Sequence, residues 1–133
     1  MAAPGGFIDY VQDQLRRWAP VSARRMFSGH GLFRGGTMFA LLIREALYFR
    51  TDAVNRGEYE AAGMKPFTYR RDGRAVALAY HEVPADILDE SDLLAGWAER
   101  AYAAALRRAL ERTTPRRKTA AKKGGPKRQG KRR

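Results

Sequence analysis

Near the beginning of the chain, apolar residues recur every three or four positions, with polar residues between them. These apolar residues are Phe7, Ile8, Val11, Leu15 and Trp18. The spacing places them on one face of an α-helix. We expect the helix to end by Pro20, because proline cannot continue a helix.

The next part of the chain contains short apolar runs separated by glycine or charged residues, a pattern typical of hairpin-linked strands. We expect these strands over residues 21–27, 32–34, 37–43 and 46–50. Gly35-Gly36 and Arg44-Glu45 are the predicted turns, and the paired glycines favour a tight turn because such turns need positive φ. The run 38–43 is apolar without alternation, which indicates a central strand covered on both faces or at its ends.

A second helix and a second hairpin follow. The predicted elements are a helix over 52–62 and strands over 65–70 and 74–80. Gly63 is expected to end the helix in a left-handed conformation, and Arg71-Asp72-Gly73 to form the hairpin turn. The last strand has alanine at alternate positions from Ala75 to Ala79, so we expect a helix to pack closely on this small face.

The last helix is predicted to begin at Asp89 or Ser91, both of which are good capping residues, and to run to about Arg112. Its expected buried stripe comprises Leu93, Leu94, Trp97, Ala98, Ala101 and Ala105. The order helix, four strands, helix, two strands, helix, with short hairpin links, predicts an α+β fold. In this fold a two-layer arrangement is expected, with an antiparallel sheet packed with helices.

Charge divides the chain into two parts. The chain has 26 Lys and Arg against 14 Asp and Glu, a net charge of +12. Ten of the basic residues and none of the acidic ones lie in residues 113–133, the basic tail. Residues 1–112 are therefore nearly neutral. We expect a folded domain over 1–112 and a disordered tail over 113–133, because the tail is too polar to form a core.

A cationic tail of this kind is typical of proteins that neutralise phosphate backbones without recognising a base sequence. The predicted partner is therefore DNA or RNA, bound non-specifically. The tail has no aromatic residue, so we expect it not to stack on bases. The alternatives are a tail that only aids solubility, or one that contacts acidic lipid or protein. The predicted nucleic-acid-binding residues are Arg116, Arg117, Lys118, Lys122, Lys123, Lys127, Arg128, Lys131, Arg132 and Arg133.

The composition argues against several other classes. There is no cysteine, which excludes disulfides and cysteine-ligated zinc. The N-terminus lacks the pattern of a secretory signal, and the longest apolar run, 38–43, is far shorter than the roughly 20 residues that span a bilayer. We therefore expect a cytoplasmic protein that is not attached to a membrane.

No set of residues predicts catalysis. His30 and His81 are the only histidines, and a metal site or a general base would need further partners for either one. We predict no enzyme activity, no cofactor and no metal. A deep pocket with strongly shifted carboxylates, such as Glu82 with Asp86, would reopen the question.

Three further features have two interpretations each. Gly29-His30-Gly31 does not continue into a dinucleotide-binding pattern, because the third glycine would fall at Arg34; we expect turn or bulge glycines there. Arg24 and Arg25 either bind a partner at the sheet edge or, as we favour, form ion pairs with acidic helix residues. The strand aromatics form either core or a stacking surface, and we favour core; they are Tyr48, Phe49, Phe67, Tyr69 and Tyr80.

An ordered set of motifs resembles the N-terminal domain of the TfoX/Sxy family. The motifs are the run 24–33 (RRMFSGHGLF), Met38-Phe-Ala40, Lys65-Pro-Phe-Thr-Tyr69, Ala79-Tyr-His-Glu-Val-Pro84, and Trp97 with the alanine-rich helix after it. The resemblance covers roughly Phe7 to Arg108. It implies a two-layer α/β fold similar to secretion-chaperone-like folds, and a bacterial regulator of competence that acts as a transcriptional co-activator.

The resemblance also sets the expected role. The full-length regulators have a second, helical domain where this chain has the basic tail, so the competence role is in doubt. Our first hypothesis is a regulatory or accessory protein that contacts a transcription-related protein and nucleic acid. The alternative is a protein-interaction or homodimerisation module whose tail only aids solubility.

Overall fold

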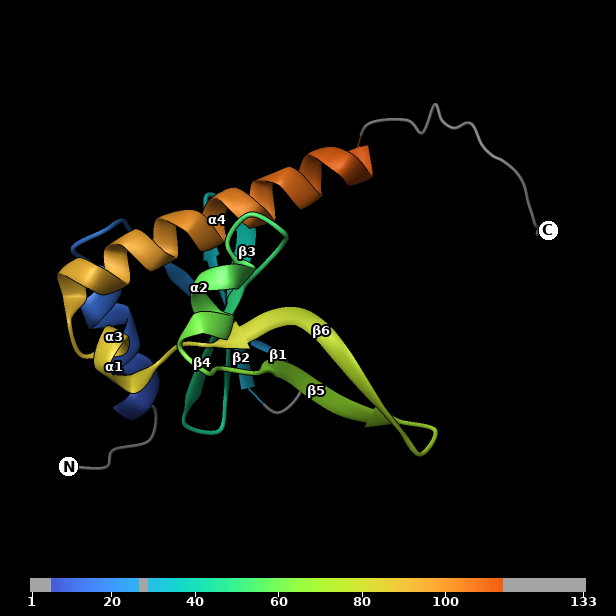
Figure 1. Cartoon of the computed structure of the whole chain (residues 1–133). Helices are drawn as coiled ribbons and strands as arrows, with labels where there is room; N and C mark the ends of the chain where they lie inside the picture. The colour runs from blue at the N-terminus through green and yellow to red at the C-terminus, as the bar shows by residue number, and fades with distance from the viewer. Residues whose placement is uncertain (1–5, 27–28, 114–133) are drawn as a thin grey trace.

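Six strands form one antiparallel sheet, in the order β1-β2-β3-β4-β6-β5 (Figure 1). The computed structural model describes residues 6–26 and 29–113 of the chain. The strands are β1 (Ser22–Met26), β2 (Gly29–Arg34), β3 (Thr37–Ile43), β4 (Ala46–Arg50), β5 (Pro66–Arg71) and β6 (Arg74–Glu82). The β5–β6 hairpin extends away from the rest of the domain (Figure 1).

Four helices accompany the sheet. They are α1 (Gly6–Leu15), α2 (Arg56–Ala61), α3 (Ala85–Leu88) and α4 (Ser91–Thr113). The long helix α4 crosses β3 and β4, and α1 and α3 lie beside its first turns (Figure 1). The predicted α+β fold, an antiparallel sheet packed with helices, is therefore confirmed. Only α3 was not expected, because four residues are too few to give a helical periodicity.

The turns agree with the sequence prediction. Gly35 and Gly36 both have positive φ, 56° and 83°, and join β2 to β3. Gly63 has a φ of 78° directly after α2, and Asp72 and Gly73 form the positive-φ turn between β5 and β6. Each of these positions has a left-handed backbone conformation. Glycine adopts this conformation readily, which is why the glycines predicted the turns.

Two helix ends differ from the prediction. α1 ends at Leu15, and the N–H groups of Trp18 and Ala19 both donate to the Leu15 carbonyl, so Trp18 lies in a turn. α2 begins at Arg56, because the Asp52 carboxylate accepts from the Val54 N–H at 2.9 Å and competes with a helical arrangement. Both differences come from local hydrogen bonds that periodicity does not reveal.

The apolar run of β3 is explained by a bulge. Met38 pairs with Phe33 and Ala40 pairs with Leu32, which leaves Phe39 as an extra residue in β3. Phe39 and Ala40 are both fully buried, and the Phe39 ring contacts Trp18 at 5.2 Å between centroids. The missing alternation thus reflects a bulge that places consecutive side chains in one core.

Gly29 and Gly31 lie inside β2, so the turn or bulge predicted for them is wrong. A Cβ at Gly29 would lie 1.9 Å from the Leu42 backbone oxygen. A Cβ at Gly31 would lie 2.7 Å from the Met38 sulfur and 3.1 Å from the Met26 sulfur. Gly29 is required by the close approach of the β3 backbone, whereas the contacts at Gly31 are with flexible methionine side chains.

The packing of α4 was largely predicted. Ala98 and Ala101 are fully buried, and their small side chains let the helix lie close to the sheet. Leu93, expected in the buried stripe, is 52% exposed. The helix packing expected on Ala75, Ala77 and Ala79 is also wrong: these alanines are exposed, because β6 has left the helix layer at that point.

Tyr59 on α2 is fully buried, and its hydroxyl has no hydrogen-bond partner among the described residues. A buried, unsatisfied hydroxyl costs about 1–3 kcal/mol. We therefore expect Tyr59→Phe to leave the free energy of unfolding unchanged or to raise it by about 1 kcal/mol, measured by chemical denaturation. A loss of more than about 1 kcal/mol would show that the hydroxyl does have a partner.

Residues 114–133 lie outside the described residues, as do 1–5 and 27–28. The disorder predicted for the tail and its ten predicted contact residues are thus not addressed by the structure. In the parts of the chain that the structure does describe, no helix is long and apolar enough to cross a membrane.

Candidate functional site

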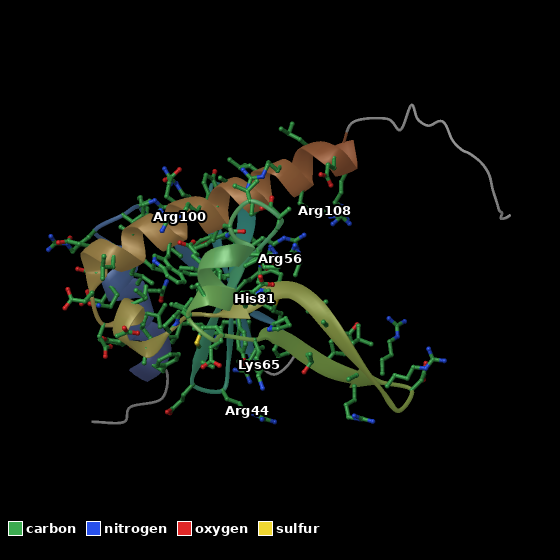
Figure 2. The ribbon with its side chains drawn as sticks, in the orientation of Figure 1. Arg44, Arg56, Lys65, His81, Arg100 and Arg108 are labelled. Carbon is green, nitrogen blue, oxygen red and sulfur yellow. The ribbon has the colours of Figure 1, made fainter. Side chains whose placement is uncertain are left out.

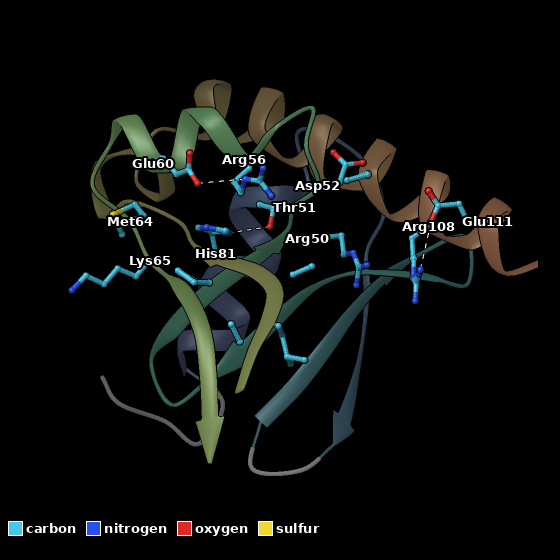
Figure 3. A pocket seen from close by; sticks show the side chains of 15 residues that line it. Arg50, Thr51, Asp52, Arg56, Glu60, Met64, Lys65, His81, Arg108 and Glu111 are labelled. Atoms are coloured by element: carbon cyan, nitrogen blue, oxygen red, sulfur yellow. Dashed lines mark hydrogen bonds and ion pairs between the residues drawn. The ribbon is translucent and has the colours of Figure 1, made fainter. Parts of the chain in front are cut away.

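A cleft of about 700 Å³ lies between α2, the last turns of α4 and the emerging β6 strand (Figure 3). Its apolar part comes from Met64, Pro66, Leu78 and the alanines of β6, and Ala104 of α4 contributes to its wall. Its size is in the range of small-molecule sites. The remaining lining residues are mostly charged, and their pairing determines what the cleft can bind.

Four cations and three acids line the cleft. The cations are Arg50, Arg56, Lys65 and Arg108, and the acids are Asp52, Glu60 and Glu111. Each acid has a cationic partner: Arg56 lies 3.4 Å from Glu60, Arg108 lies 3.5 Å from Glu111, and Arg107 lies 2.6 Å from Asp52. The first two pairs are largely exposed, so solvent weakens them.

Arg50 and Lys65 have no acidic partner within the ranges 6–26 and 29–113. Arg50 is the last residue of β4, and its guanidinium lies over the Tyr80 ring, 5.3 Å from the centroid. Its Nε atom is buried and has no hydrogen-bond partner in the described part of the chain. A buried polar atom that lacks a partner in a native structure calls for an explanation, such as a bound ion or water.

Asp52 and Arg107 hold the two walls of the cleft together. The Arg107 guanidinium donates two hydrogen bonds to the Asp52 carboxylate, at 2.6 and 2.9 Å, in the bidentate geometry that favours such pairs. The hydrogen bond from Arg107 lowers the pKa of Asp52. The pair therefore fixes the C-terminal half of α4 over the loop that follows β4.

His81 lies at the base of the cleft and is 5% exposed. Its Nδ1 shares a hydrogen bond of 2.9 Å with the Thr51 hydroxyl, and its ring contacts Tyr59. Burial lowers the pKa of His81, while the charge of Glu60 acts in the opposite direction. The structure thus favours a neutral imidazole, in a structural role for which Thr51 fixes the ring.

This depressed pKa predicts a pH dependence of stability. The unfolded chain takes up a proton on His81 as the pH falls below about 6.5, whereas the folded state resists it. The contribution of His81 is therefore complete above pH 6.5 and is lost as the pH falls toward the lower folded pKa. Unfolding experiments between pH 7.5 and about 5 should show a decline that His81→Gln abolishes; an equal slope in both proteins would contradict it.

The two arginines of β1 lie where the first interpretation, binding of a partner at the sheet edge, would place them. Arg24 and Arg25 are exposed on β1, which is an edge strand. Arg24 lies over the Phe33 ring at 4.8 Å. Among the described residues neither arginine has an ion pair with an acidic residue, so the ion pairs that the sequence favoured are absent there.

The strand aromatics divide between core and partly exposed positions. Phe49 and Tyr80 are buried, as favoured, whereas Tyr48, Phe67 and Tyr69 remain partly accessible. The rings of Tyr48 on β4 and Phe67 on β5 pack edge to face, with 5.1 Å between their centroids, although β6 lies between these two strands. The expected core role thus holds for only part of the set.

The two histidines are not brought together, because His30 is on β2 and His81 is on β6, with β3 and β4 between these strands. Glu82 and Asp86 are not among the residues that line the cleft. Within residues 6–26 and 29–113 there is no group of three or more His, Asp or Glu that could hold a metal ion.

Sequence analysis missed two basic features. The cleft cations come from distant parts of the chain, and no local signal joins them. Arg70, Arg71 and Arg74 are exposed at the tip of the β5–β6 hairpin, which extends away from the part of the domain where Arg100 and His81 lie (Figure 2). These three arginines flank a predicted turn, so the sequence does contain a signal for them. The signal was overlooked because the net charge of the whole domain is close to zero.

The order of the strands, the antiparallel sheet and the long final helix define a small α+β domain. The family model of the TfoX N-terminal domain matches residues 13–105, which is most of the chain. The chain therefore belongs to the TfoX N-terminal domain family, as the motif resemblance predicted. A comparison with curated proteins gives no match.

Proposed function

We propose that this chain is a non-enzymatic regulatory or accessory protein that associates with nucleic acid through its basic tail. The observation that carries the proposal is the charge distribution: ten Lys and Arg and no acidic residue lie in residues 113–133. A role in transcription or competence agrees with the family to which the chain belongs. The tail supplies affinity for phosphates, and the domain supplies the contact with a protein partner.

The structure supports this arrangement in one respect. α4 continues to Thr113 and carries Arg107, Arg108 and Arg112 near its end, of which Arg107 and Arg108 pair with Asp52 and Glu111, so the basic tail follows a helix end that has basic residues of its own. A phosphate backbone bound by the tail is therefore close to the end of α4. The near-neutral remainder of the domain leaves its other surfaces free of strong repulsion toward a protein partner.

Fluorescence anisotropy of the full-length protein on short duplex DNA, single-stranded DNA and RNA, across a salt series, tests the proposal. We expect all three to bind, with affinity falling steeply as salt rises, because counterion release drives binding. An absence of binding near physiological salt would contradict the proposal. Light scattering on the same samples would then decide whether the protein is a homodimerisation module, the alternative function.

A further inference from the structure

We propose that the cleft lined by Arg50, Lys65 and Arg108 binds a phosphate monoester. The monoester belongs either to a free nucleotide or to the 5′ end of a nucleic-acid strand. This inference goes beyond the proposed function, because it assigns a ligand site to the domain itself. It stands whether or not the basic tail binds nucleic acid.

The charge of the cleft selects the class of ligand. Each of the three lining acids is neutralised by an arginine, whereas Arg50 and Lys65 have no acidic partner within residues 6–26 and 29–113. The cleft thus has two cations without an acidic partner, of which Lys65 extends to the opposite side from Arg50 and Arg108 in Figure 3. A phosphate monoester carries about −1.5 to −2 charges near neutral pH, whereas a carboxylate or a phosphodiester carries only about −1.

Arg50 is the group that most directly requires a ligand. Its Nε is buried without a hydrogen-bond partner in the described part of the chain, and its guanidinium is held over Tyr80. A guanidinium held in this way, with an unpartnered Nε, matches the planar geometry by which arginine binds phosphate oxygens. In Figure 3 the Arg50 and Arg108 side chains extend in the same direction, from β4 and α4 respectively.

The second cation can turn toward the ligand at little cost. Arg108 contacts Glu111 at 3.5 Å, and both side chains are more than half exposed. Such a pair contributes little to stability, so Arg108 can exchange it for a phosphate oxygen. Its place on α4 is fixed by the neighbouring Arg107–Asp52 pair, which keeps this part of the helix over the cleft.

The uncharged residues that line the cleft determine which organic group of the ligand can be recognised. Met64, Pro66 and Leu78 offer apolar contact, and the described lining contains no Phe, Tyr or Trp ring; its one imidazole, His81, is 5% exposed and packs against Tyr59. We therefore expect recognition of the phosphate rather than of the base. Nucleotides that carry different bases should bind with affinities within a few-fold of each other.

The inference is tested by titration calorimetry on a full-length chain whose ten tail cations are changed to Gln, which removes competing sites. The probes are a nucleoside 5′-monophosphate, the same nucleoside without phosphate, and a dinucleoside phosphate, which is a diester. We expect the monophosphate to bind at least about tenfold more tightly than the other two, because only it carries two charges. Equal binding of all three would overturn the inference.

Substitutions of the lining arginines test whether the monophosphate binds in this cleft. Arg50→Gln and Arg108→Gln should each weaken monophosphate binding about tenfold or more, the effect of losing charged hydrogen bonds. Arg17→Gln, in the turn after α1 and paired with Asp92 in the first turn of α4, does not line the cleft; it should leave binding within about twofold and serves as the matched control. Thermal unfolding verifies that each variant is folded. If Arg50→Gln is unfolded, then Arg108→Gln provides the test, because Arg108 lies at an exposed position of the helix.

Two oligonucleotides distinguish the source of the monoester. If a strand with a 5′ phosphate competes with the nucleotide and the same strand without it does not, the site accepts strand ends; if neither competes, it takes free nucleotides only. Arg50-dependent binding in the chain with a neutralised tail supports the site even if the wild-type protein fails to bind nucleic acid. Unchanged affinity in both Arg50→Gln and Arg108→Gln would overturn the inference, whatever the tail does.

Discussion

Changing the ten Lys and Arg of the basic tail to Gln is expected to lower the affinity for duplex DNA by at least about 10³-fold at low salt. The tail carries +10 of the net charge of +12, and each contact with a phosphate releases a counterion from DNA. The remaining domain is nearly neutral and cannot replace those contacts. Anisotropy titrations of both proteins under identical salt conditions measure the effect.

A permuted tail is the matched control for this change. It keeps the same 21 residues of 113–133 in a different order, so it has the same charge and composition. Because phosphate contacts carry no sequence information, we expect its affinity to remain within about twofold of the wild-type value. A loss comparable to that of the Gln variant would mean that the order of residues matters, which contradicts non-specific binding.

Gly29→Ala is expected to cost about 3 kcal/mol of the free energy of unfolding, the upper end of the range for overpacking. An added Cβ would lie 1.9 Å from the Leu42 carbonyl oxygen, which is backbone of the neighbouring strand and cannot rotate away. Relief of this contact requires β2 and β3 to separate. Since small domains have a total stability of only about 5–15 kcal/mol, a large drop in melting temperature follows.

Gly57→Ala is the control for that substitution. Gly57 lies in α2, and a Cβ there would meet no atom within 4 Å. Alanine should therefore stabilise the protein by about 0.5 kcal/mol, because glycine is a poor helix former. If Gly29→Ala were no more destabilising than Gly57→Ala, then β2 and β3 would not approach each other as closely as the structure shows.

The fold could be predicted well where the signal is local. Gly35-Gly36, Gly63 and Asp72-Gly73 marked turns correctly, because a positive φ leaves a trace in the residue type. The bulge at Phe39 and the close approach at Gly29 left no such trace, since both depend on which strand lies opposite. The same holds for the alanines of β6. Their small side chains predicted that a helix packs on this face of the strand, whereas these alanines are exposed.

The cleft could not be predicted for a related reason. Arg50, Lys65 and Arg108 are separated by up to 58 positions in the sequence, and they line one cleft only because the chain folds α4 back over the sheet. In the sequence each is one of 26 basic residues. That Arg50 Nε has no hydrogen-bond partner among residues 6–26 and 29–113 depends on the three-dimensional arrangement of these residues and has no counterpart in the sequence. The charge of the basic tail, by contrast, is a property of the sequence alone.

The most direct measurement is the slope of log K against log salt for duplex DNA, taken for the wild-type protein and for chains in which five or all ten tail cations are changed to Gln. We expect a slope of up to about −9 for the wild type, since each neutralised phosphate contributes about −0.9. The slope should be roughly half as steep with five cations left and near zero with none. Equal slopes in all three proteins would show that the domain, and not the basic tail, binds nucleic acid.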